Sequence, residues 1–382
     1  MDMLKVYLCI ITVFLLFLIP VPAQAQVTGS CSNCHTMHNS QNGSPMDFDS
    51  NTQPNHHLLR TNGCIGCHAQ DHTTNVVNFS GSLIPQVIHT DDDLAAGNFA
   101  YIDGSKGSGA SATKGHNVID FFNQDPTHLW PPGGPYKNSG AKIVHPDTMP
   151  ARFTCAGLYG CHGNTHIVDP IASMQGAHHT NSGSRPTGHT VGNSYRFLLG
   201  VEGLEVSDWE NRNSTHHNEY KRDLHQSTHP YVNACTWCHG PDNPYHGISG
   251  DVMPPGSGTA YLCMRCHPVF HSKAANSFSW LRHPANVSIP DYGEYQYYTE
   301  YSIDAPVSRL WNPPPTVPSS VVTPYRGPQG QGIDFVTCIS CHKAHATDHP
   351  DLLRWDYSNI EAGGGGLTDT GCFICHTTKD DS

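Results

Sequence analysis

The sequence has little of what normally builds a protein interior. Only 37% of its 382 residues are apolar and only 14% are charged, and both fractions are low for a globular protein. The chain is long enough for two or three ordinary domains, but it has too few aliphatic side chains for cores of that size. Charged residues are also too scarce for charge-driven disorder. Another component must supply the interior, and 28 histidines and 15 cysteines indicate a metal or cofactor.

Basic side chains are scarce as well. Lys and Arg number 20 against 32 Asp and Glu, which gives a formal net charge of -12. Binding to nucleic acid requires a basic surface that neutralises phosphates. The sequence therefore predicts no nucleic-acid partner.

Long hydrophobic runs are absent except at the start of the chain. An apolar run extends from Val6 to Ile19 and is followed by Pro20 and by the small residues Ala23 and Ala25. A run of about 14 residues is short for a bilayer span, and this arrangement is typical of a secretory signal peptide. We expect residues 1–25 to be removed and 26–382 to be exported to the periplasm, the cell surface or the medium, with no transmembrane segment after cleavage. An uncleaved anchor is the alternative.

Every cysteine after residue 25 belongs to a pair that is followed directly by histidine. Cys-x-x-Cys-His is the attachment sequence of c-type haem: two thiols bond to one edge of the porphyrin, and the next residue places an imidazole under the iron. Zinc needs four grouped ligands and does not require this histidine, and disulfides do not require it either. We therefore predict haem at six motifs: Cys31, Cys34 and His35; Cys64, Cys67 and His68; Cys235, Cys238 and His239; Cys263, Cys266 and His267; Cys338, Cys341 and His342; Cys372, Cys375 and His376.

A seventh site departs from this spacing. Five residues separate Cys155 from Cys161, and His162 follows. Gly157 and Gly160 make it sterically easy for these residues to bulge outward, which would let both thiols reach one porphyrin. We expect a seventh haem c here, with a disulfide or a single thioether bond as the alternatives.

The second axial ligand is predicted to be histidine. Seven proximal histidines leave 21 of the 28, whereas two of the eight methionines lie within the first three residues. Iron with two imidazole ligands has no open position and carries electrons, and its potential lies below that of His/Met iron. A histidine three residues after a proximal one is too close to reach the other face of the same haem and is expected to bind a neighbouring haem. The candidate distal ligands, one more than needed, are His38, His57, His116, His179, His217, His271, His283 and His345.

The motif spacing predicts haem pairs near 31–68, 235–267 and 338–376 and a lone site at 155–162. We expect 26–382 to form a single haem-stapled region with the fold of a multihaem cytochrome c. It would be mostly irregular coil with short helices and a few short strands, and its haems would form the core. Residues 103–115 are expected to form a flexible surface loop. The tyrosines between 292 and 301 form a strand edge, pack on haem faces or are ordinary loop aromatics.

These motifs resemble multihaem c-type cytochromes with doubled Cys-x-x-Cys-His motifs, which metal-respiring bacteria export. The resemblance also covers the phrases CSNCHTMHNSQNGSPM, CAGLYGCHG, GAHH, HNEY, RHP and CFICHTTKD. It implies electron carriage in the periplasm or outside the cell. Some members of the wider class polymerise into extracellular filaments, and others work with outer-membrane conduits.

The sequence therefore predicts an electron-transfer protein with no catalytic residues. A multihaem reductase of nitrogen or sulfur oxyanions is the alternative; it would need one open iron, for which 155–162 is the candidate site. Redox partner proteins are expected, among them an outer-membrane conduit or further copies of this chain. Haem motifs near both ends of the sequence are compatible with contacts between copies.

Overall fold

The computed structural model describes residues 30–41, 43–47, 55, 58–61, 63–79, 82–118, 131–132, 153–163, 167–174, 198, 220–222, 262–263, 266–267, 283, 285, 287–290, 292–298, 305–310, 334–362 and 371–379. The predicted signal peptide 1–25 and the motif at 235–239 lie outside these ranges. So do four candidate distal ligands: His57, His179, His217 and His271.

The helices of the described segments are short. Four α-helices of four residues each are α2 (Ile65–His68), α3 (Ala100–Asp103), α4 (Pro170–Ser173) and α7 (Cys338–Cys341). Single 3₁₀ turns are η1 (Cys31–Asn33), η3 (Ala112–Lys114), η8 (Gly293–Tyr295), η9 (Pro350–Leu352), η10 (Tyr357–Asn359) and η11 (Gly371–Ile374). Isolated helices of this length are unstable in water, so they must be stabilised by what they pack against.

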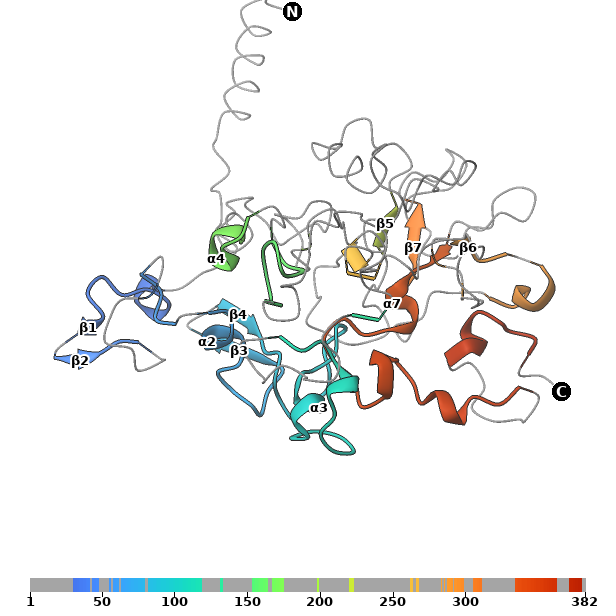
Figure 1. Ribbon diagram of the computed structural model, residues 1–382, viewed down its shortest axis with the longest axis horizontal. Helices are drawn as coiled ribbons and strands as arrows, with labels where there is room; N and C mark the ends of the chain where they lie inside the picture. Colours follow the sequence, from blue (N-terminus) through green and yellow to red (C-terminus); the bar gives the residue numbers. More distant parts are fainter. Residues whose placement is uncertain are drawn as a thin grey trace, which may run out of the picture.

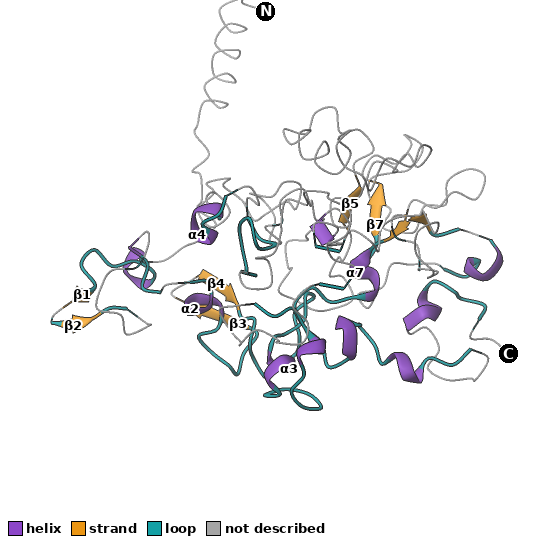
Figure 2. Ribbon diagram, in the orientation of Figure 1, coloured by secondary structure: helices purple, strands orange, loops and turns teal. Residues whose placement is uncertain are grey.

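The strands are equally short. One antiparallel pair joins β1 (Ser40–Gln41) to β2 (Ser44–Pro45), and another joins β3 (Val76–Phe79) to β4 (Ser82–Pro85). A four-stranded sheet has the order β5-β7-β8-β6, with β5 (Tyr220–Arg222) parallel to β7 (Ser308–Leu310). In that sheet β8 (Asp334–Val336) runs antiparallel to both β7 and β6 (Val287–Ser288). Loops predominate over helices and strands (Figure 2), which confirms the predicted coil with short helices and few strands.

The described segments are spread along the long axis of the molecule (Figure 1). The hairpin of β1 and β2 lies at one end, α2 with β3 and β4 lies next, and α3 is near the middle. The segment that ends at the described C-terminal residues lies at the opposite end. Within the described ranges no helix is both long and apolar enough to cross a membrane.

Two small apolar clusters lie within these segments. Their buried members are Ile88, Phe99, Ala100, Ile102, Val118 and Ala346 in the first, and Ile289, Tyr298, Val307 and Val336 in the second. The first cluster joins residues 88–118 to the C-terminal segment through Ala346. Both clusters are small for a chain of 382 residues, in keeping with the shortage of aliphatic side chains.

Residues 103–115, expected to form a flexible loop, are held to the C-terminal segment. Lys114 at the end of η3 is buried and donates hydrogen bonds from Nζ to Asp348 Oδ1 at 2.9 Å, Ser108 Oγ at 2.9 Å and the carbonyl oxygen of Gly109 at 2.8 Å. Asp348 Oδ1 also accepts from the backbone N–H of Ser108 at 2.8 Å. The glycine- and serine-rich composition did not reveal this buried ion pair.

Candidate haem sites

All six described motifs close with the same backbone hydrogen bond. The N–H of the histidine donates to the carbonyl oxygen of the first cysteine, and the N···O distances lie between 2.8 and 3.1 Å at His35, His68, His162, His267, His342 and His376. At the five motifs with two residues between the cysteines, this bond completes one helical turn. The turn brings the two cysteines and the histidine of each motif together, as attachment of one porphyrin requires.

The site with the longer spacing closes in the same way. His162 N–H donates to Cys155 O at 2.9 Å, and Cys161 N–H donates to the same oxygen at 3.1 Å. The insertion depends on two glycines. Gly157 has φ +81°, and a Cβ at Gly160 would lie 2.4 Å from the carbonyl oxygen of Thr154. The five intervening residues, three more than at the other sites, therefore bulge out and leave the ends of the motif as they are at those sites.

Three proximal histidines are oriented by backbone carbonyls. Nδ1 lies 2.7 Å from Pro85 O at His68, 2.8 Å from Pro132 O at His267 and 2.8 Å from Asp351 O at His342. A carbonyl oxygen only accepts, so Nδ1 carries the proton and Nε2 carries the lone pair. Metal-ligating histidines are commonly fixed in this way.

His376 is oriented by a carboxylate instead. Its Nδ1 lies 2.7 Å from Glu294 Oε1, and Lys379 Nζ lies 3.1 Å from Glu294 Oε2. Hydrogen bonds from Lys379 and His376 lower the pKa of Glu294 to about 2, so its carboxylate is ionised at neutral pH.

Three proximal histidines each face another imidazole. The ring centres are 6.2 Å apart for His267 and His116, 6.1 Å for His162 and His345, and 6.1 Å for His376 and His283. A bond from a metal to an imidazole nitrogen is about 2 Å long, so two rings on opposite sides of one metal have centres about 6 Å apart. The three pairs therefore have the separation that a bis-histidine iron requires.

Two of these facing imidazoles are held neutral. Burial, followed by the proximity of His267, lowers the pKa of His116 to about 4. Burial, followed by His162, lowers the pKa of His345 to about 3. His116 Nδ1 also hydrogen-bonds to Ala344 O at 2.7 Å, which leaves Nε2 with the lone pair. A neutral imidazole is the form that binds a metal.

A cavity of about 90 Å³ that opens to solvent lies beside the C-terminal motif. Its lining includes His283, His376, Cys372 and Cys375, so it contains both facing imidazoles and both thiols. Trp355 also lines it, and the buried Nε1 of Trp355 has no hydrogen-bond partner among the described residues. The donor set around this cavity, two thiols and two imidazoles, fits a covalently attached haem.

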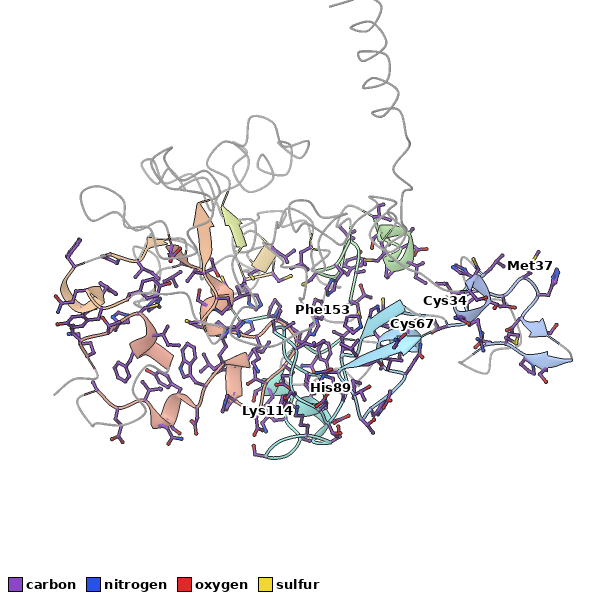
Figure 3. The ribbon with its side chains drawn as sticks, turned by 180° about the vertical axis from the view of Figure 1, so that it is seen from behind. Cys34, Met37, Cys67, His89, Lys114 and Phe153 are labelled. Atoms are coloured by element: carbon purple, nitrogen blue, oxygen red, sulfur yellow. The ribbon has the colours of Figure 1, made fainter. Side chains whose placement is uncertain are left out.

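Thiols of different motifs contact one another. Cys34 and Cys67 are hydrogen-bonded through their side chains, which lowers the pKa of Cys34 to about 6 and raises that of Cys67. Figure 3 shows these two residues where the N-terminal hairpin meets α2. Cys263 and Cys338 make the same kind of contact. The attachment points of neighbouring motifs therefore adjoin.

Weaker electrostatic contacts extend this series. Cys161 interacts with Cys263, and Cys341 interacts with Cys372. His345, which faces His162, also interacts with His68. These interactions link each described motif to the next one along the chain, and His345 provides the link between the motifs at 64–68 and 155–162.

One further candidate distal ligand, His38, lies within the described ranges. His38 is exposed. Two residues that were not selected from the sequence are notable. His89, labelled in Figure 3, is fully buried. Asn98 Oδ1 accepts from the backbone N–H of His89 at 3.3 Å, and Asn98 Nδ2 donates to the carbonyl oxygen of His89 at 2.6 Å. Glu294 lies within the tyrosine cluster. No local sequence signal distinguished either residue from ordinary loop residues.

Solved structures give a weak similarity. The chain superposes on "OmcS nanowires from Geobacter sulfurreducens", determined by cryo-EM, with a TM-score of 0.45 and 17% identity over 94% of this chain and 92% of that chain. An "Outer Membrane Cytochrome S Filament" from the same organism gives a TM-score of 0.42 and 17% identity over 94% and 93% of the two chains. TM-scores below 0.5 do not establish a common fold.

No curated protein matches the chain significantly. The comparison with family models is more specific. Residues 331–381 match the family model "Doubled CXXCH motif", and this range contains the motifs at 338–342 and 372–376. The two motifs of this segment therefore match the doubled-CXXCH pattern, as the sequence led us to expect.

Proposed function

We propose that this chain is an exported electron-transfer protein that holds about seven c-type haems in a row, most of them between two histidines. The observation that carries this proposal is the set of three facing imidazole pairs, each with its ring centres 6.1 or 6.2 Å apart. The proposed pairs are His116 with His267, His345 with His162, and His283 with His376.

Haem iron supplies a one-electron couple when it is bound. The protein residues do the rest. The thiols would anchor the group, and the paired imidazoles would bind its iron from both sides and leave no position for a substrate. The contacts of Cys34 with Cys67 and of Cys263 with Cys338 keep neighbouring sites close. Because electron transfer slows steeply with distance, close spacing along a series of sites favours conduction.

The reductase alternative requires an open iron. The candidate for it was the site at 155–162, yet His345 faces His162 with ring centres 6.1 Å apart. This geometry favours closed coordination there too. It supports an electron carrier over an enzyme.

The proposal places the protein in the periplasm or at the cell exterior after removal of residues 1–25. It would exchange electrons with a redox partner protein, an outer-membrane conduit or another copy of itself. Negative-stain microscopy of the concentrated holoprotein distinguishes filaments from dispersed particles and so separates the last option from the others.

Two measurements test the central claim. Mass spectrometry of the mature protein should find seven haem additions, one of them on the peptide with Cys155 and Cys161. The reduced protein should show only low-spin iron and no spectral change with carbon monoxide. A folded protein without haem would overturn the proposal, and stoichiometric binding of carbon monoxide would favour the reductase.

A further inference from the structure

We propose that Glu294 is a positioning residue that lowers the reduction potential of the haem site at 372–376. This site would have the lowest potential among the four described sites where the hydrogen bond from the proximal histidine Nδ1 is defined. This inference rests on the proposed function. It adds that, among the four sites compared, the one of lowest potential is at the C-terminal motif.

The contrast between proximal histidines carries the inference. At His68, His267 and His342 the Nδ1 proton is bound by a neutral backbone carbonyl. At His376 it is bound by the carboxylate of Glu294 at 2.7 Å. A hydrogen bond to an ionised acceptor is shorter and stronger than one to a neutral acceptor. Among these four Nδ1 hydrogen bonds, the one at His376 is to a carboxylate and the other three are to carbonyl oxygens.

The carboxylate is held against His376 by the main chain. The carbonyl oxygen of Glu294 accepts from Thr378 N–H at 3.2 Å and from Thr377 Oγ1 at 3.1 Å. Thr377 Oγ1 in turn accepts from Tyr297 N–H at 3.1 Å. These bonds fasten the loop that carries Glu294 to the residues immediately after His376. The contact between Glu294 and His376 is therefore built into the fold rather than left to a freely rotating side chain.

A tyrosine of the same loop covers the imidazole. The ring centre of Tyr295 lies 4.9 Å from that of His376, with an angle of 46° between the planes. The side chains of His376 and Glu294 are 26% and 30% exposed. Partial shielding from water strengthens the effect of the charge on the imidazole.

The chemical consequence follows from charge. A carboxylate draws the Nδ1 proton toward itself, which makes Nε2 a stronger electron donor. A stronger donor and a nearby negative charge both stabilise ferric over ferrous iron. Hydrogen bonding to an axial ligand is one of the means by which proteins set haem potentials. The site at 372–376 should therefore be harder to reduce than the sites with carbonyl partners.

Lys379 moderates this effect. Its Nζ lies 3.1 Å from Glu294 Oε2, on the oxygen that does not contact His376. Its side chain is 56% exposed, so water and salt screen its charge. Removal of the Lys379 charge should leave the carboxylate more strongly negative at the imidazole and should lower the potential further.

Spectroelectrochemical titration of the full-length holoprotein tests the opposite effects of Glu294 and Lys379 on the reduction potential of this site. Glu294→Gln keeps an oxygen acceptor and removes the charge, so one haem component should shift to a more positive potential. We expect at least a tenfold change in its redox equilibrium constant, which is about 59 mV for a one-electron couple. Lys379→Gln should shift the same component in the negative direction. Glu361→Gln, at an exposed carboxyl, is the matched control and should shift none.

Electron paramagnetic resonance of the oxidised protein provides a second readout. Glu294→Gln should change the signal of one low-spin haem, because only one imidazole loses its charged partner. Unchanged potentials and signals in both Glu294→Gln and Lys379→Gln, with haem present on the 372–376 peptide, would overturn the inference alone. Absence of haem from that peptide in the wild-type protein would instead overturn the proposed function at this site.

Discussion

His116 and His345 are held to each other by the main chain. The N–H of His116 donates to the carbonyl oxygen of His345 at 3.0 Å, and His116 Nδ1 hydrogen-bonds to the carbonyl oxygen of Ala344 at 2.7 Å. Each of the two imidazoles faces a different proximal histidine, His267 or His162. One backbone contact thus sets the positions of two candidate distal ligands, so it fixes two neighbouring haem sites relative to each other.

The ion pair beside this contact should stabilise it. Lys114 and Asp348 flank His116 and His345, and the side chain of Lys114 is only 8% exposed. Lys114→Met should lower the free energy of unfolding by about 1–3 kcal/mol, because it leaves the hydrogen-bonding groups around Nζ unsatisfied. Thermal unfolding followed by circular dichroism measures this. Lys379→Met at an exposed ion pair should change stability by less than about 0.5 kcal/mol, and an equal loss in both variants would contradict the prediction.

Loss of a facing imidazole should open one iron. His116→Ala and His283→Ala should each produce one equivalent of high-spin haem that binds carbon monoxide after reduction, whereas the wild-type protein should bind none. Absorption spectra of the reduced protein with and without the gas measure the stoichiometry. His72→Ala, at an exposed histidine, is the control and should behave as wild type. If neither variant bound carbon monoxide, the assignment of these histidines as distal ligands would be wrong.

The covalent part of the site was predictable because its chemistry is local. Two thiols and an imidazole must meet one porphyrin, so their spacing is visible in the sequence. The distal side is not local. His116, His283 and His345 were candidates from short-range context. In the structure the ring centre of each lies 6.1 or 6.2 Å from that of a motif histidine, and their axial ligation stays a prediction. Which proximal histidine each one faces depends on tertiary structure, and no motif records it. For the same reason the contact of Glu294 with His376 and the burial of His89 were not apparent.

The fold was predictable only in character. Frequent Gly and Pro and the absence of a sustained helical or strand period indicated coil with short elements. The four-stranded sheet could not be derived, because β5 and β7 are three residues each and pair in parallel from distant parts of the chain. Segments this short carry no periodicity. Their pairing depends on what packs around them.

Asp93 should make stability sensitive to acid. Its carboxylate accepts from Lys106 at 2.8 Å, Tyr101 at 3.0 Å and Lys343 at 3.1 Å. Burial acts to raise the pKa of Asp93, but the two lysines outweigh it and hold the pKa below its usual value. A carboxyl with a depressed folded-state pKa stabilises the fold above its unfolded pKa of about 4, and this stabilisation is lost as pH falls through the folded-state pKa.

Asp93→Asn should therefore be less stable than wild type by about 1–3 kcal/mol at pH 7. The difference should shrink toward zero as the pH falls below about 4. Thermal unfolding of both proteins across this range measures the convergence. A difference independent of pH would show that the loss comes from packing rather than from the charge of Asp93.

Gly160 should determine whether the motif with the longer spacing receives its haem. A Cβ at this position would lie 2.4 Å from Thr154 O and 2.5 Å from Ala156 N, both of which are backbone atoms that cannot rotate away. Gly160→Ala should therefore distort the turn that brings Cys155 and Cys161 together, at a cost of about 1–3 kcal/mol from overpacking. Mass spectrometry of the purified variant should find haem lost from this peptide and retained at the other motifs. Gly63→Ala is the control, because Gly63 lies immediately before Cys64 and has open space around its Cβ, and this variant should keep its full haem content. Full haem content in Gly160→Ala as well would show that the bulge tolerates a side chain.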